Sequence, residues 1–203
     1  GLNGRVRQSL PGGPLSNVAR RETTSGGRRQ VVAMASDRGR NGVALFTLDP
    51  DTLQVAPWGV VPVAVSEPYG FCLGKRGDVV VAVLVGKAGD VKQLALEAEG
   101  DKPKLVEERA FAVGSQAEGC VVDGVTRAAF VGGGAKGIWR YGFDPASGAT
   151  RTLLAGAPSP ELVPDVEGLT LLREGAKTFL IASSQGDGGV VRWPVGRAGA
   201  RRA

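Results

Sequence analysis

A short motif that recurs every 49 residues constrains the fold of this chain more than any other feature. Each copy places an acidic or aromatic residue before a glycine and an apolar run, and three clear copies read EPYGFCL from Glu67, SQAEGCVV from Ser115 and PDVEGLTL from Pro164. Their glycines are Gly70, Gly119 and Gly168. A weaker copy, SNVARR, begins one period upstream at Ser16. Self-similarity at a fixed period of this length indicates an array of supersecondary units that bury their apolar faces against one another.

A second pattern repeats in phase with the first and consists of two apolar runs joined by a small polar or glycine-rich turn. The four stretches are residues 31–48, 79–96, 127–143 and 178–195. Runs of four to six residues rich in Val, Leu, Ile and Phe and broken by glycine turns are typical of β-hairpins. Several short strands per repeat match a propeller blade, which has four strands. The sequence therefore predicts an all-β fold, a β-propeller of four-stranded blades, with about four blades present.

The two ends of the chain do not coincide with the borders of a repeat. Gly1 falls within a blade, and the apolar pattern ends after Trp193 in the sequence PVGRAGARRA. A propeller closes its ring because closure protects the edges of its sheets. We therefore expect a section of a larger ring, organised as one domain over residues 1–203 with a basic tail at 194–203.

Composition and charge exclude several classes of protein. The 32 glycines and 12 prolines exclude a bundle of long helices, and no stretch approaches the ~18 apolar residues of a membrane helix, so membrane insertion is not expected. The net charge of +5 belongs to the ends, because residues 1–40 hold eight Arg and two acids and residues 191–203 hold four Arg and no acid. Such ends can bind phosphate, RNA or anionic lipid, or can be solvated tails. No interleaved aromatic residues mark them as a nucleic-acid platform, so nucleic acid is not an expected partner.

The absence of histidine restricts the chemistry that this chain can perform. It excludes Ser-His-Asp and Cys-His mechanisms and all His-ligated metals. The two cysteines, Cys72 and Cys120, lie far apart inside apolar runs, and we interpret both as small buried hydrophobic residues. The GxGxxG match at residues 132–137 precedes the strand-like sequence IWRYGF rather than a helix, so it is not a dinucleotide fingerprint. Carboxylates, Lys, Arg, hydroxyls or an oxygen-ligated metal remain.

Carboxylates stand at equivalent places in successive repeats. Glu118, Asp165 and Glu167 come at the starts of repeated strands, directly before or near the repeated glycines. Equivalent positions on successive blades point to the same end of the channel, and converging carboxylates favour an oxygen-ligated cation such as calcium or magnesium. Tyr69 holds the same place one blade earlier. The alternative interpretation is that these residues form structural turns with solvated acids.

Basic residues occupy the hairpin turns of the same repeats. Arg38 lies in SDRGRNG and Lys87 in VGKAGD. If these turns face the same end as the carboxylates, cations for an anionic substrate stand beside a candidate metal cluster. That combination suits phosphoryl chemistry, although each residue on its own would equally suit a solvated surface.

The series of motifs resembles the β-propeller phytases. EPYGFCL, VGKAG, SQAEG, GIWRY, PDVEGLTL and IASSQG occur in the order and at the spacing of that family, over about Leu15 to Trp193. Single motifs are weakly specific, but the ordered series is a strong joint signal. The resemblance implies a six-bladed propeller that releases phosphate from phytate (myo-inositol hexakisphosphate) as a calcium-dependent 3-phytase-type hydrolase. It also implies an extracellular or periplasmic location.

The resemblance assigns roles to the residues that match the family motifs. It implies that Arg38 and Lys87 bind substrate phosphate and that several calcium ions are held by Glu118, Asp165 and Glu167. The catalytic residues that it implies are Tyr69, Glu118 and Glu167. The family mechanism has no covalent intermediate, because water attacks the phosphate in line while Arg and Lys offset the growing oxyanion charge.

Three departures from the family pattern leave alternatives open. The turn before the IW strand, where the family carries acids, is Gly132-Gly133-Gly134-Ala135-Lys136, and Ala19 stands where an acidic residue is expected. Residues expected in a first and a last blade are also missing from the sequence. A non-catalytic phytase-like propeller that binds a ligand or partner is therefore an alternative. A third hypothesis is a protein that binds nucleic acid or the cell envelope through its Arg-rich ends.

Overall fold

The computed structural model of the chain describes residues 3–25, 28–99 and 102–195. Its described part consists of β-strands in four antiparallel sheets and two short 3-10 helices, η1 (Pro145–Ser147) and η2 (Gln185–Asp187). Blade 1 holds β1 (Leu15–Ser25), β2 (Arg28–Asp37), β3 (Gly42–Leu48) and β4 (Val55–Pro62). Blade 2 holds β5 (Pro68–Arg76), β6 (Val79–Gly86), β7 (Asp90–Glu99) and β8 (Lys102–Ala112). Blade 3 holds β9 (Ala117–Asp123), β10 (Ala128–Gly133), β11 (Gly137–Gly142) and β12 (Arg151–Gly156), and blade 4 holds β13 (Val166–Glu174), β14 (Lys177–Ser184) and β15 (Gly189–Pro194).

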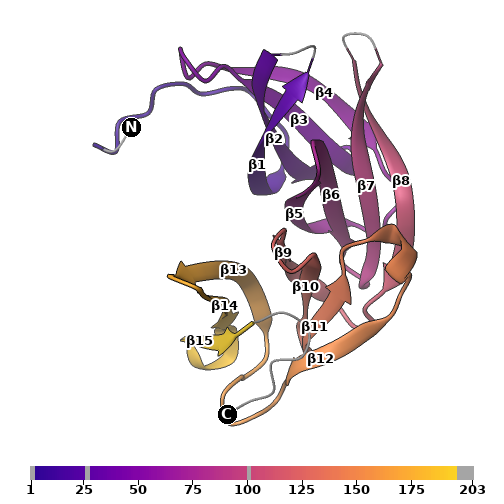
Figure 1. Cartoon of the computed structure of the whole chain (residues 1–203), viewed down its shortest axis with the longest axis vertical. Helices are drawn as coiled ribbons and strands as arrows, with labels where there is room; N and C mark the ends of the chain where they lie inside the picture. The colour runs from indigo at the N-terminus through magenta and orange to yellow at the C-terminus, as the bar shows by residue number, and fades with distance from the viewer. Residues whose placement is uncertain (1–2, 26–27, 100–101, 196–203) are drawn as a thin grey trace.

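The four sheets follow one another around an arc, as the blades of a β-propeller do (Figure 1). In each sheet the strands pair in sequence order, and the first strand of each blade (β1, β5, β9 and β13) lies on the inner side of the arc. The predicted all-β propeller with about four blades is confirmed, and each predicted hairpin stretch forms the second and third strands of one blade. Membership of a six-bladed ring stays a prediction. No described helix is long and apolar enough to cross a membrane.

The core lies between neighbouring blades rather than within any one of them. In β6, alternate residues serve two different clusters: Val81, Val83 and Val85 pack against blade 3, whereas Val80 and Leu84 pack against blade 1. A third cluster joins blades 3 and 4. Because both faces of the sheet are covered, β6 reads as one continuous apolar run instead of an alternating pattern.

The recurring glycines provide the close approach between inner strands. A Cβ atom added to Gly70 would stand 1.7 Å from the carbonyl oxygen of Glu118, and one added to Gly119 would stand 1.6 Å from the carbonyl oxygen of Glu167. The backbone of the next blade therefore packs directly against each of these two glycines. The contacting residue is the one before the next repeated glycine: Glu118 before Gly119, and Glu167 before Gly168. At Gly168 the nearest described atom is a side-chain carbon of Ser183 at 3.9 Å. The period of 49 residues is thus maintained by a steric requirement at the inner strands.

Buried polar side chains also tie the blades together. Arg109 of β8 is 8% exposed and donates hydrogen bonds to the carbonyl oxygens of Gly142 (2.6 Å) and Gly148 (2.7 Å) in blade 3. Between blades 3 and 4, Arg173 of β13 forms an ion pair with the buried Asp123 at 2.7 Å. Burial opposes ionisation of Asp123, but the hydrogen bonds from neighbouring groups outweigh it and lower the pKa of this carboxyl.

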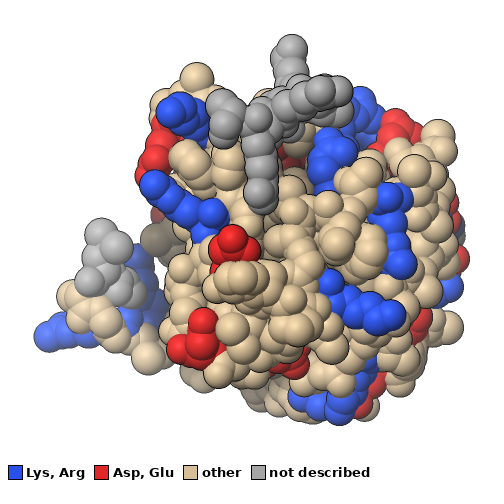
Figure 2. All heavy atoms as spheres, turned by 90° about the horizontal axis from the view of Figure 1, so that it is seen from below, with Lys and Arg blue, Asp and Glu red and all other residues tan. Residues whose placement is uncertain are grey.

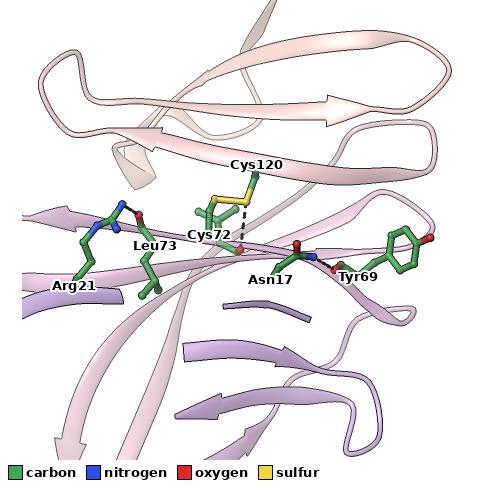
Figure 3. The surroundings of a disulfide bond; sticks show 7 residues. Asn17, Arg21, Tyr69, Cys72, Leu73 and Cys120 are labelled. Atoms are coloured by element: carbon green, nitrogen blue, oxygen red, sulfur yellow. Dashed lines mark hydrogen bonds between the residues drawn. A yellow bond between two sulfur atoms is a disulfide. The ribbon is translucent and has the colours of Figure 1, made fainter. Parts of the chain in front are cut away.

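The interpretation of the two cysteines as separate buried hydrophobic residues was wrong, because Cys72 and Cys120 form a disulfide (Figure 3). Cys72 lies on β5 and Cys120 on β9, so the bond joins the inner strands of blades 2 and 3. Their Cα atoms are 5.7 Å apart although 48 residues separate them in sequence. Both side chains are nonetheless buried, at 7% and 8% exposure. Spacing alone did not indicate the pairing, because only the ring places equivalent positions of neighbouring repeats side by side.

Removing this disulfide should lower the free energy of unfolding by about 2–4 kcal/mol, because the bond closes a long loop in the unfolded chain. The test is urea denaturation of the parent and of the Cys72→Ala/Cys120→Ala variant, each with and without reductant. Reductant should destabilise the parent alone. Detection of two free thiols in the folded parent by a thiol reagent would contradict the pairing.

The expectation of basic ends changes once the fold is known. Within residues 3–25 and 28–40, Arg29 pairs with Glu22 (2.7 Å), Arg40 pairs with Asp37 (2.6 Å), and Arg21 donates to the carbonyl of Leu73. These arginines therefore belong to the fold rather than to a solvated tail. Figure 2 shows Lys and Arg interspersed with Asp and Glu on the face drawn, without a continuous basic surface.

The predicted basic tail at 194–203 overlaps the last strand. Pro194 ends β15, and Val195 is buried in the cluster between blades 3 and 4. The rest of that tail, residues 196–203, lies outside the described residues. Residues 102–104 of the GDKPK sequence lie in β8, which pairs with β7 within blade 2; Gly100 and Asp101 lie outside the described residues.

Candidate functional site

A cleft of about 560 Å³ lies along the inner strands of all four blades. Its lining includes Ala19 of β1, Phe71 of β5, Glu118 of β9 and Glu167 of β13. The disulfide between Cys72 and Cys120 forms part of the wall. The cleft is therefore the part of a propeller channel that these four blades enclose, and two of the predicted carboxylates lie in it.

One backbone hydrogen bond recurs in every blade and places the hairpin turns at the same end as the starts of the inner strands. In each case the first residue of the turn between the second and third strands donates its N–H to the carbonyl of the segment that enters the inner strand. The four bonds are Arg38 to Pro14 (3.2 Å), Lys87 to Glu67 (2.9 Å), Gly134 to Gln116 (2.9 Å) and Gln185 to Asp165 (2.9 Å). The predicted cations and the predicted carboxylates thus occupy the same end of the propeller.

Arg38 and Lys87 converge on Tyr69. The guanidinium carbon of Arg38 and the Nζ atom of Lys87 each lie 5.4 Å from the centre of the Tyr69 ring. Both cations also contact one carboxylate, since Arg38 donates to Oε1 of Glu67 and Lys87 Nζ lies 3.8 Å from Oε2 of the same residue. The side chain of Asn17 donates to the backbone carbonyl of Tyr69 at 2.7 Å and connects this strand to blade 1 (Figure 3). The structure brings together the predicted cations and the predicted tyrosine.

The loop that carries Glu67 is held by its own hydrogen bonds. Asp90 accepts from the backbone N–H of Ser66 (2.9 Å) and from its hydroxyl (2.6 Å), and that hydroxyl also accepts from the N–H of Ala88 (3.0 Å). These bonds fasten the start of β5 to the turn that contains Lys87. The relative position of Glu67 and Lys87 is therefore set by backbone and short side chains, not by the two long side chains themselves.

Glu118 lies within electrostatic range of the two other predicted carboxylates. Burial, followed by the negative charges of Glu167 and Asp165, raises the pKa of Glu118, and the positive charge of Arg38 acts in the opposite direction. Asp165 reaches toward the glycine-rich turn of blade 3, because a Cβ added to Gly134 would stand 2.0 Å from its Oδ1 atom. The carboxylates and a cation therefore influence the same group at one end of the cleft.

The oxygen atoms of Glu118, Asp165 and Glu167 are suitable ligands for calcium, but the three side chains are not close enough together to form a complete calcium site. The three predicted ligands offer carboxylate oxygens, which calcium prefers, and their mutual repulsion is relieved by a cation. In residues 3–25, 28–99 and 102–195, no group of three or more His, Cys, Asp or Glu side chains is arranged to hold a metal ion. Calcium takes six to eight oxygen ligands. Any ion held here would therefore complete its coordination with backbone carbonyls, water or an anionic substrate.

The repulsion predicts that Glu118→Gln stabilises the protein when calcium is absent. The neutral amide removes an unfavourable charge beside Glu167 and Asp165. In the presence of a chelator, the variant should therefore unfold at a slightly higher urea concentration than the parent protein. The gain should be only a few tenths of a kcal/mol because water screens half-buried charges. A destabilised variant under chelator would show that Glu118 is a structural residue.

Glu67 is a charged residue at this end of the cleft that the sequence did not single out. Glu67, Gln116 and Asp165 follow one another at intervals of 49 residues. The recurring backbone bond shows that these three positions are structurally equivalent. The repeat therefore contained a signal for Glu67, because Glu67 is the blade 2 equivalent of Asp165, which the sequence had singled out in blade 4.

The fold and the site together define a β-propeller with cations and carboxylates gathered at one end of its channel. The family profile described as "Phytase" matches residues 1–195. The chain therefore belongs to the phytase family.

One curated relative agrees with this assignment. The chain is 29% identical over 198 residues to the 3-phytase of Bacillus subtilis (strain 168), a match that covers 92% of this chain and 52% of the relative. The chain thus spans about half the length of the curated relative that it matches.

Among the solved structures, one match with a TM-score above 0.5 supports the fold alone. The complex of the fission yeast SREBP-SCAP binding domains matches with a TM-score of 0.55 and 10% identity, over 95% of this chain and 52% of that one. The dihydro-heme d1 dehydrogenase NirN in complex with DHE matches with a TM-score of 0.49 and 15% identity, over 91% and 38% of the two chains. At these identities the likeness says nothing about ligands.

Proposed function

We propose that this chain is a calcium-dependent phosphomonoester hydrolase of the phytase type that releases phosphate from phytate. One observation carries the proposal: two cations, Arg38 and Lys87, converge at the end of the channel where Glu118 is influenced by two other carboxylates. An anionic substrate and a cation can be accommodated side by side there. Membership of the phytase family supports the choice of substrate class.

The residues of the chain have distinct roles in this proposal. Arg38 and Lys87 bind phosphate oxygens and offset the negative charge that grows during in-line attack. The ring of Tyr69 helps to position both cations by cation–π contacts. Glu118, Asp165 and Glu167 would hold calcium, which when bound supplies positive charge that polarises a phosphoryl oxygen and activates water.

The direct test is phosphate release from phytate by the purified chain, with calcium and again with a calcium chelator. Release that requires calcium is the expected result. Release that is unaffected by chelator would overturn the calcium dependence while leaving the hydrolase in place. Binding of phytate without release would favour the second candidate function.

That second candidate is a non-catalytic propeller that binds a phosphorylated ligand or partner. It is favoured by the acid-free turn from Gly132 to Lys136, by Ala19 in the cleft, and by the lack of a closed ligand set in the described residues. The two functions differ in turnover. A calorimetric titration that shows calcium-dependent phytate binding, combined with no phosphate release over many hours, would identify the binding protein.

We also propose that the protein acts outside the cytoplasm, in an extracellular or periplasmic compartment. The support is the disulfide between Cys72 and Cys120, because such bonds persist in oxidising compartments and are rare in the cytosol. Fractionation of the source cells, followed by immunodetection, tests this location.

A further inference from the structure

One carboxylate neutralises both cations of the phosphate site. The two oxygens of Glu67 are divided between its partners, since Oε1 accepts from Arg38 and Oε2 lies 3.8 Å from Nζ of Lys87. Within residues 3–25, 28–99 and 102–195, neither cation forms an ion pair with another residue. Glu67 therefore holds the only described carboxylate that bridges the two groups proposed to bind substrate.

The bridging carboxylate makes the contacts that a bound phosphate would make. A phosphate that bound Arg38 and Lys87 together would also direct separate oxygens to a guanidinium and an ammonium. The two positive charges are already close together, because both cations lie 5.4 Å from the centre of the Tyr69 ring. The side chain of Glu67 thus stands where such a ligand would make its contacts.

This internal contact is one that a ligand can displace. The side chains of Arg38, Lys87 and Glu67 are 41%, 45% and 36% exposed, so water screens the pairs and holds them weakly. A phosphate dianion carries more charge and more acceptor oxygens than a carboxylate. Phosphate should therefore win the competition, but its affinity is reduced by the loss of the contacts to Glu67.

From this geometry we infer that Glu67 is a specificity-determining residue that occupies the phosphate site in the free protein and must be displaced by substrate. The inference rests on the proposed function only in taking Arg38 and Lys87 as the phosphate-binding cations. Displacement discriminates by charge: a monoanion gains too little from the two cations to replace the carboxylate, whereas a phosphate dianion, or a ligand that carries several phosphates, gains enough.

The test measures binding without catalysis, by ³¹P NMR titration of inorganic phosphate in the presence of a calcium chelator. Glu67→Gln should bind phosphate about three- to tenfold more tightly than the parent, because two exposed ion pairs no longer compete. Chloride and formate should inhibit phosphate binding to the variant more than to the parent. Glu67→Ala should show the same gain and excludes an effect of the introduced amide.

Two controls isolate the competition from a change in net charge. Glu107→Gln alters the charge equally but affects an ion pair with Lys92 on β7 (3.0 Å), so it should bind as the parent does. Arg38→Gln combined with Glu67→Gln should lose the gain, since the released cation is then absent. Equal or weaker phosphate binding by a folded Glu67→Gln protein overturns the inference. Because no turnover is measured, a failure of the phytase proposal would appear separately, as no phosphate release from phytate.

Discussion

Gly119→Ala should destabilise the protein by more than about 4 kcal/mol, which is a large part of the roughly 5–15 kcal/mol that stabilises a typical domain. The added Cβ would stand 1.6 Å from the carbonyl oxygen of Glu167. Since both atoms are anchored to the backbone, no side-chain rotation can relieve the overlap, and blades 3 and 4 would have to separate. Urea denaturation followed by circular dichroism measures the loss.

Gly168→Ala is the matched control for this prediction. Gly168 stands at the same place in the repeat, but the nearest described atom to its added Cβ is 3.9 Å away. The substitution should change the stability by no more than about 0.5 kcal/mol, because alanine in a strand costs no backbone strain here. Equal effects of the two substitutions would show that the glycines serve the local strand and not the contact between blades.

Glu118→Gln and Glu167→Gln should each reduce calcium-dependent phosphate release from phytate by about 10²–10³-fold. An amide keeps the shape of the side chain but carries no charge to offset a dication. The loss should be accompanied by weaker calcium binding, measured by calorimetry, while the circular dichroism spectrum stays that of the parent. Activity assays over a range of calcium concentrations will show whether excess calcium restores part of the rate.

The outer-strand variant Glu107→Gln serves as the control for the carboxylate variants, because its ion pair with Lys92 lies on β7 and β8, away from the inner strands. It should retain full activity and full calcium affinity. Unchanged rates in both Glu118→Gln and Glu167→Gln would sink the metal assignment. An activity loss in Glu118→Gln alone would confine that assignment to blade 3.

The fold was largely predictable because its sequence signals are local. Apolar runs joined by glycine turns indicate hairpins. The regular interval from Gly70 to Gly119 to Gly168 indicates the repeating blades. The blade boundaries were less certain. Residues 102–104 (Lys-Pro-Lys) have the composition of a connection between blades, yet they lie in β8, because an edge strand tolerates proline.

The candidate site was predictable only in part. The repeat phase and the family motifs singled out Arg38, Tyr69, Lys87 and the three carboxylates, and the structure brings the two cations onto one ring. Their assignment to phosphate and calcium stays a prediction. The sequence reasoning missed Glu67, because its importance comes from bridging two residues that lie 29 and 20 positions away in the chain.

The amino-acid sequence by itself determined the architecture: the period, the hairpins, the all-β class and the family. Each depends on residue types at short or regular spacing, because local backbone and side-chain preferences favour particular turns and strands. Only the tertiary structure decided which positions of different repeats meet. It paired Cys72 with Cys120, placed the carbonyl of Glu167 against Gly119, and set Glu67 between two cations. These contacts arise from the packing of blade against blade, which brings together groups that no local pattern connects.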